Sequence, residues 1–128
     1  MQQAIYGRFT NSSGSAITSG YHTSKDIGNT NSPQSNANQF KLADDMYSIP
    51  TYDSRIHLYI WIYNSQLSTQ QTFITYHGHE VWFGNALRQG IHGEGMQRVA
   101  GEHNSFYIFP EASSWASGGR YSMWGVDL

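Results

Sequence analysis

The segment from Ile56 to Asn64, which reads Ile-His-Leu-Tyr-Ile-Trp-Ile-Tyr-Asn, constrains the fold of this chain more than any other stretch. Aliphatic residues occupy every second position, and the positions between them hold rings: His57, Tyr59, Trp61 and Tyr63. Successive side chains of a β-strand point to opposite faces, so the pattern predicts a strand with one aliphatic and one aromatic face. Because an open edge this apolar would recruit other chains, we expect the strand in the centre of a sheet. We expect a loop or a neighbouring subunit, rather than a soluble ligand, to cover its aromatic face.

Other short apolar segments recur along the chain, separated by Gly, Asn, Ser and Pro, and no long stretch has a helical period. This punctuation predicts an all-β fold: an antiparallel β-sandwich or flattened barrel of about eight or nine short strands, with little or no helix. A length of 128 residues fits a single domain, residues 1–128. Besides 56–64, the expected strands are residues 4–10, 15–21, 40–42, 46–49, 71–76, 80–83, 97–100, 105–109 and 120–128.

Three segments are expected to connect these strands. Residues 22–39 hold almost no apolar side chain and include a proline, so they are expected to form one long loop, which is a common place for binding residues. Residues 77–79 are expected at the tip of a hairpin. Residues 84–95 are crowded with glycine and have no clear period, and the only local structure they suggest is a single helical turn at 87–89.

The charge content narrows the class of partner. Charged residues make up 12% of the chain, about half of the roughly 25% usual in soluble domains. Its polar surface must therefore consist mainly of uncharged hydrogen-bonding groups, which suit sugar hydroxyls or packing against further copies of the chain. A net charge of −2 with neutral histidines argues against a nucleic-acid partner, because such binding depends on clustered Lys and Arg.

The chain contains no cysteine, so disulfides and thiolate metal sites are excluded. Its first residues lack the basic-then-apolar pattern of a signal peptide, and no apolar run approaches the ~20 residues of a membrane span. We expect an extracellular or virion-associated protein that has no recognisable signal peptide.

The motif His77-Gly78-His79-Glu80 is the first candidate for chemistry. On a strand, both imidazoles would share a face and could hold one metal ion. The remaining ligands could come from His92, Glu94 or His103. The motif resembles the His-x-His start of the cupins, but Phe83 and Gly84 stand where that family has a glutamate. A hairpin tip with water-facing histidines is the simpler interpretation, so we assign no metal and no cofactor.

No catalytic motif stands out. The spacing of the glutamates selects no acid–base pair for glycoside hydrolysis, and the chain has no nucleophile elbow, P-loop or dinucleotide fingerprint. We therefore expect a protein that is not an enzyme.

Aromatic residues make up 15% of the chain, and several lie beside polar loop residues. The C–H faces of sugars stack on such rings, while Asn, Arg and His bind the hydroxyls. The expected ligand-binding residues are two stacking platforms and four hydrogen-bonding partners: Trp82, Trp115, His77, His79, Asn85 and Arg88.

These features predict an oligomeric, non-enzymatic protein that binds cell-surface glycans, as a lectin or as a virion or phage fibre adhesin. In character the chain is similar to small lectins, virion fibre tips and small pore-forming sandwiches such as aegerolysins and actinoporins, although no motif assigns it to one of them. One alternative is therefore a membrane-active pore-forming toxin whose aromatic side chains contact lipid. Another is a purely structural virion protein that forms a homo-oligomer and binds no ligand.

Overall fold

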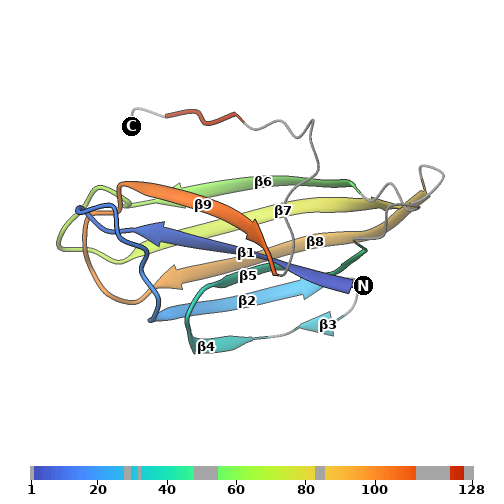
Figure 1. Ribbon diagram of the computed structural model, residues 1–128, viewed down its shortest axis with the longest axis horizontal. Coiled ribbons are helices and arrows are strands. Elements are labelled where there is room, and N and C mark those ends of the chain that lie inside the picture. Colours follow the sequence, from blue (N-terminus) through green and yellow to red (C-terminus); the bar gives the residue numbers. More distant parts are fainter. Residues whose placement is uncertain are drawn as a thin grey trace.

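The computed structural model describes residues 2–27, 30–31, 33–47, 55–82, 86–111 and 122–125. These ranges contain nine β-strands and no helix (Figure 1). The strands are β1 (Gln2–Thr10), β2 (Tyr21–Ile27), β3 (Thr30–Asn31), β4 (Gln34–Ala37), β5 (Phe40–Tyr47), β6 (Arg55–Tyr63), β7 (Thr72–Trp82), β8 (Ala86–Gln97) and β9 (Ser105–Pro110).

The strands form two antiparallel sheets that pack face to face (Figure 1). The smaller sheet has the order β5-β1-β9. The larger has the order β3-β2-β8-β7-β6, and β4 also pairs with β2. The predicted antiparallel β-sandwich of about eight or nine strands without helix is therefore confirmed.

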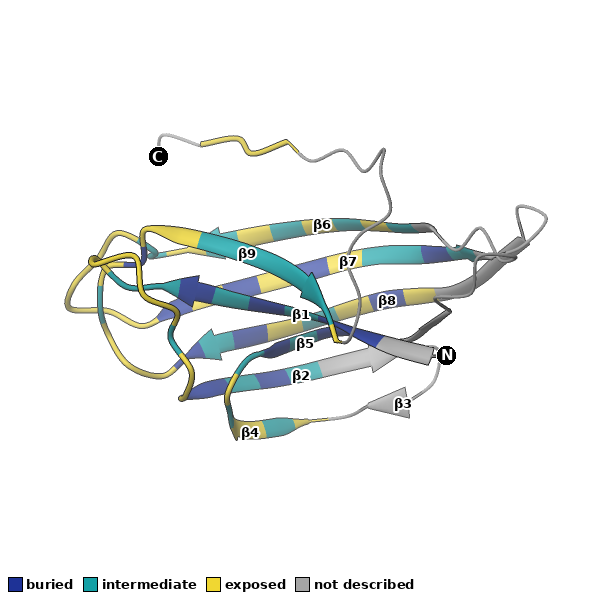
Figure 2. Ribbon diagram, in the orientation of Figure 1, coloured by how far each residue is buried: buried dark blue, intermediate teal, exposed yellow. Residues whose placement is uncertain are grey.

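The core lies between the sheets and is built largely from rings. Phe9, Tyr21 and Phe40 are almost completely buried, and they meet edge to face: the centroids of Phe9 and Phe40 are 5.8 Å apart, and those of Tyr21 and Phe40 are 4.6 Å apart. Such pairs add about 0.5–1.5 kcal/mol each beyond the area they bury. Buried and exposed positions alternate along β7 and β8, as Figure 2 shows, so each strand places one face in this core.

Glycines make room for the core rings. A Cβ atom at Gly95 on β8 would lie 2.6 Å from Cε1 of Phe40, and one at Gly7 on β1 would collide with the ring of Phe106. Residues 84–95 showed no period in the sequence because glycines fill inward positions of β8 where apolar side chains would be expected. The expected helical turn at 87–89 is wrong, since these residues belong to β8.

The Tyr21 hydroxyl ties the start of β2 to β1 and to the loop between them. It accepts a hydrogen bond from the buried Phe9 amide at 2.9 Å and donates one to the Ile17 carbonyl at 3.1 Å. Burial raises the pKa of Tyr21 above its ordinary value. The expected strand at 15–21 is wrong. Residues 11–20 connect β1 to β2 through a turn whose backbone amides donate to the Asn11 side chain, and their one β-bridge joins Thr10 to Ala16.

The expected long loop at 22–39 is also wrong, because it contains most of β2 together with β3 and β4. The inward positions of β2 include Tyr21 and Thr23, and Thr23 is only 4% exposed. A strand whose buried face carries a threonine has no aliphatic alternation, so its period is invisible in the sequence. Residues 40–42 and 46–47, expected in two short strands, belong to one strand, β5, whose pairing with β1 contains register shifts, and residues 48–49 of the second expected strand lie outside the described residues.

Residues 77–79 are not a hairpin tip but the middle of β7. Gly78 faces the sandwich interior opposite Leu58, and a Cβ atom there would collide with the carbonyl oxygen of His57. The glycine permits close approach of β6 rather than a turn. The expected strand at 97–100 is wrong as well, since β8 ends at Gln97. At the C-terminus, 122–125 form no strand, and the rest of 120–128 lies outside the described residues.

The expected strand at 56–64 is present as β6, but it lies at the end of the larger sheet rather than in its centre. Alternation of side chains reports the two faces of a strand and carries no information about its neighbours. No described segment of the chain covers its aromatic face, since Tyr59 is 61% exposed, Trp61 45% and Tyr63 46%, and cover by a neighbouring subunit stays a prediction.

Candidate binding face

Eight side chains gather on the outer surface of the larger sheet, over β6 and β7. The aliphatic positions of β6 point into the sandwich, so the alternate positions point outward, and the antiparallel register places outward residues of β7 beside them. The cross-strand pairs are Tyr63 with Phe73, Trp61 with Thr75, Tyr59 with His77, and His57 with His79. We refer to these eight residues as the aromatic face.

The rings of the aromatic face stack on one another. The His77 ring lies 5.3 Å from that of Tyr59 and 5.1 Å from that of Trp61, with each pair of planes about 24° from parallel. The rings of His57 and His79 stack at 4.9 Å and 20°. Rings on β7 thus cover one side of the rings on β6. No described strand lies beyond β6, so the other side of Tyr59 and Trp61 faces solvent.

Hydrogen-bonding groups accompany the rings. The Tyr63 hydroxyl and Thr75 Oγ1 lie 3.4 Å apart, and both side chains are exposed. On the next strand, β8, His92 lies beside His77 and Glu94 lies beside Thr75. The surface therefore combines apolar ring area with imidazole, hydroxyl and carboxylate groups, which can donate to or accept from a hydroxylated ligand.

Two of the six predicted ligand-binding residues, His77 and His79, belong to this face. They lie two apart on a continuous strand, the arrangement that the metal-site alternative required, whereas the simpler interpretation of a hairpin tip is wrong. Asn85 and Trp115 lie outside the described residues, and only the backbone of Trp82 and Arg88 is described. Sequence reasoning recognised the rings of β6 but not their exposure, and it missed Phe73 and Thr75, whose pairing with β6 no local pattern reveals.

The histidines do not assemble a metal centre in the described part of the chain. Within those ranges, no three or more His, Cys, Asp or Glu side chains are placed to hold a metal ion. His103, a suggested third ligand, lies apart from the aromatic face: it is buried, and its Nδ1 shares a 2.7 Å hydrogen bond with Thr72 Oγ1.

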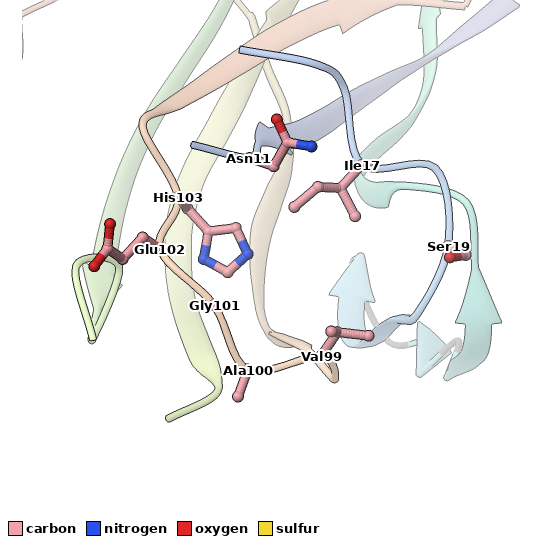
Figure 3. Close-up of a pocket in the computed structure, with 8 residues that line it drawn as sticks. All are labelled: Asn11, Ile17, Ser19, Val99, Ala100, Gly101, Glu102 and His103. Atoms are coloured by element: carbon pink, nitrogen blue, oxygen red, sulfur yellow. The ribbon is translucent and has the colours of Figure 1, made fainter. Parts of the chain in front are cut away.

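A pocket of about 300 Å³ lies beside the loop that follows β1 (Figure 3). It is lined by Asn11, Ile17, Ser19, Val99, Ala100, Gly101, Glu102 and His103. Two of its polar side chains already form hydrogen bonds within the fold. Asn11 Oδ1 accepts hydrogen bonds from the backbone amides of Ser13 and Ser15, and His103 Nδ1 shares one with Thr72 Oγ1. Burial lowers the pKa of His103, which favours a neutral imidazole packed 4.8 Å from the Phe9 ring. The pocket is therefore the weaker candidate for ligand binding.

The smaller sheet carries a second group of rings on its outer surface. Phe109 lies 5.9 Å from the Tyr6 ring and 5.3 Å from the Tyr107 ring, and the Arg8 guanidinium lies 5.1 Å from its centroid. All four side chains are half-buried, and Arg8 donates to Asn38 and Gln39. These rings pack against their neighbours and offer less free area than the aromatic face.

Comparison of the chain with family models, with curated proteins and with solved structures gave no match. No helix in the described ranges is long and apolar enough to span a membrane.

Proposed function

We propose that the protein is a non-enzymatic recognition protein that binds cell-surface carbohydrate through the aromatic face. The observation that carries the proposal is the exposed stack of Tyr59, His77 and Trp61. Ring surface left open to water at the end of a sheet offers a stacking partner for the C–H faces of sugars. The neighbouring threonine, histidine and glutamate side chains supply partners for the hydroxyls.

The shape of the face favours a polymeric ligand. Sites for single small molecules are usually concave and enclose most of the ligand, whereas the aromatic face lies on the open surface of a sheet. Outward side chains recur every ~6.7 Å along each strand. An extended glycan could therefore place successive sugar units against successive ring pairs. A lectin or a virion fibre adhesin would meet such a ligand at a cell surface.

A glycan array probed with the purified wild-type protein tests this proposal. We expect binding to extended glycans, and we expect soluble oligosaccharide to compete better than the corresponding monosaccharide. Absence of binding across the array at high micromolar protein would refute the proposal. Equal competition by monosaccharide and oligosaccharide would refute the extended ligand in favour of a small enclosed site.

A second candidate function, contact with lipid membranes, has one observation in its favour. Met123 is 77% exposed and Trp124 is 85% exposed, and aromatic side chains of this kind are typical of the membrane–water interface. Dye release from vesicles of phosphatidylcholine alone separates the two functions. These vesicles carry no sugar, so dye release from them would not depend on glycan binding. Dye release that is lost in Trp124→Ala and retained in Trp61→Ala would support membrane activity.

A further inference from the structure

Strand β6 is paired along only one of its two backbone edges in the described part of the chain. It ends the larger sheet and, among the described residues, its ladder of hydrogen bonds runs only to β7. The opposite edge of an antiparallel strand presents alternating N–H and C=O groups that can pair with another chain.

The other sheet edges have features that block such pairing, whereas β6 does not. At the far side of the larger sheet, β3 has two residues and β4 has four. In the smaller sheet, β5 contains Asp44 and Asp45 and register shifts, and β9 ends in Pro110. Strand β6 is nine residues long, contains no Pro, Gly or Lys, and pairs with β7 without a bulge. Long and regular edges with few charged residues are the ones that recruit further strands.

Both faces of β6 are incompletely covered. Its inward side chains, Ile56, Leu58, Ile60 and Ile62, are only partly buried although they pack against the core. Its outward side chains belong to the aromatic face and are exposed. A strand added beside β6 would cover apolar surface on both sides of the sheet at once.

We infer that β6 pairs antiparallel with β6 of a second copy of the chain, about a two-fold axis at Tyr59. Tyr59 is the central residue of Arg55–Tyr63, so this register matches the strand with itself. Ile56 then lies opposite Ile62 of the second copy, and Leu58 lies opposite Ile60 of the second copy. Aliphatic side chains meet aliphatic ones in the core layer.

The same register is favourable on the outer surface. His57 lies directly opposite Trp61 of the second copy, so an imidazole and an indole become neighbours, as His77 and Trp61 are on a diagonal within one chain. Arg55 is the only charged residue in the sequence of β6, and in this register its position falls opposite that of Tyr63 rather than that of a second arginine. This self-complementarity selects a second copy over an unrelated strand. The inference does not depend on glycan binding.

The size of the interface sets the expected affinity. Pairing of two nine-residue strands should bury less surface than the ~1,600 Å² of a standard stable interface. We therefore expect a dissociation constant in the micromolar range. Sedimentation velocity of the full chain over a wide micromolar concentration range should show a reversible monomer–dimer equilibrium.

Charge substitutions at the two-fold axis test the register. Tyr59→Lys places two positive charges opposite each other, and Tyr59→Glu places two negative ones. Each variant alone should weaken dimerisation at least tenfold, and an equimolar mixture of the two should recover it. Because Tyr59 is 61% exposed, both variants should keep the fold. Thr75→Lys, on the neighbouring strand and also exposed, is the matched control and should leave the dimer unchanged.

Two outcomes would overturn the inference. The first is a monomer at every concentration, and protection of every β6 backbone amide from hydrogen exchange in that monomer would mean that the chain covers its own edge. The second is a dimer that neither Tyr59 variant weakens, which would place the interface elsewhere.

Discussion

The indole of Trp61 and the imidazole of His77 stack on the outer surface of the larger sheet, with centroids 5.1 Å apart and planes 24° from parallel. The two residues lie on neighbouring strands, so the contact depends on the antiparallel register of β6 and β7. The register fixes which side of the indole meets the imidazole, and within one chain the Trp61 side chain remains 45% exposed.

Removal of this indole should therefore abolish most ligand binding while the fold survives. We expect Trp61→Ala to weaken binding to a responsive glycan by tenfold or more, which corresponds to about 1.4 kcal/mol. Isothermal titration calorimetry measures the change. Tyr107→Ala, which removes a ring from the outer surface of the other sheet, is the matched control and should bind as wild type does. Equal weakening by both substitutions would contradict a site on the aromatic face.

Gly78 should resist substitution because its inward side has no room for a methyl group. Gly78→Ala would force Cβ against the carbonyl oxygen of His57 and push β6 away from β7. We expect a loss of about 2–3 kcal/mol in the free energy of unfolding, measured by urea denaturation. Gly90→Ala is the control, because nothing lies within 4 Å of the added Cβ at Gly90. A Gly78→Ala variant as stable as Gly90→Ala would be inconsistent with this packing.

The Tyr21 hydroxyl should contribute measurably to stability through the Phe9 amide. In Tyr21→Phe this buried N–H loses its side-chain acceptor, which costs about 1–3 kcal/mol. Tyr63→Phe removes an exposed hydroxyl whose hydrogen-bond distance to Thr75 is 3.4 Å, and it should cost far less. Urea titration of both variants gives the comparison. Similar losses of unfolding free energy in the two variants would argue against the buried hydrogen bond between the Phe9 amide and the Tyr21 hydroxyl.

Stability should fall as the pH drops below the ordinary range of histidine. Burial lowers the pKa of His103 in the folded state, whereas an unfolded chain titrates near 6.5. The unfolded state therefore takes up the proton first, so the contribution of His103 is fully present above about pH 6.5 and is lost as the pH falls towards the lower folded pKa. Thermal unfolding from about pH 7.5 to 5.5 should show this slope. His103→Asn should reduce it, and an unchanged slope would assign the pH dependence to other groups.

The fold class was predictable from the sequence because alternation and turn residues report strands directly. The alternation from Ile56 to Ile62 predicted strand β6 and the two faces of its side chains. The positions of strands in the sheets were not predictable, because hydrogen-bonding neighbours leave no trace in the alternation. Strand β6 was expected in the centre because so apolar an edge would recruit other chains, and this argument does not exclude an edge strand. Strands β2 and β8 were missed for a different reason: their buried faces carry Thr23 and Gly95, which give no apolar signal.

The candidate site was predicted in part for the same reason. His77 and His79 were recognised by their spacing, and their correct environment follows only from the pairing of β7 with β6. Trp61 was recognised as an outward ring that a loop or a neighbouring subunit would cover; no described loop covers it, and cover by a subunit stays a prediction. The two tryptophans expected as stacking platforms, Trp82 and Trp115, have no described side chains.

Because the aromatic face is open rather than enclosed, a ligand resting on it keeps much of its surface in water. Each copy of the chain would then hold a glycan weakly and release it quickly. Attachment would become firm only where several copies engage neighbouring glycans at the same time, since linked sites gain from their effective concentration. Such a protein would respond to the density of sugars on a surface more sharply than to the identity of any one of them.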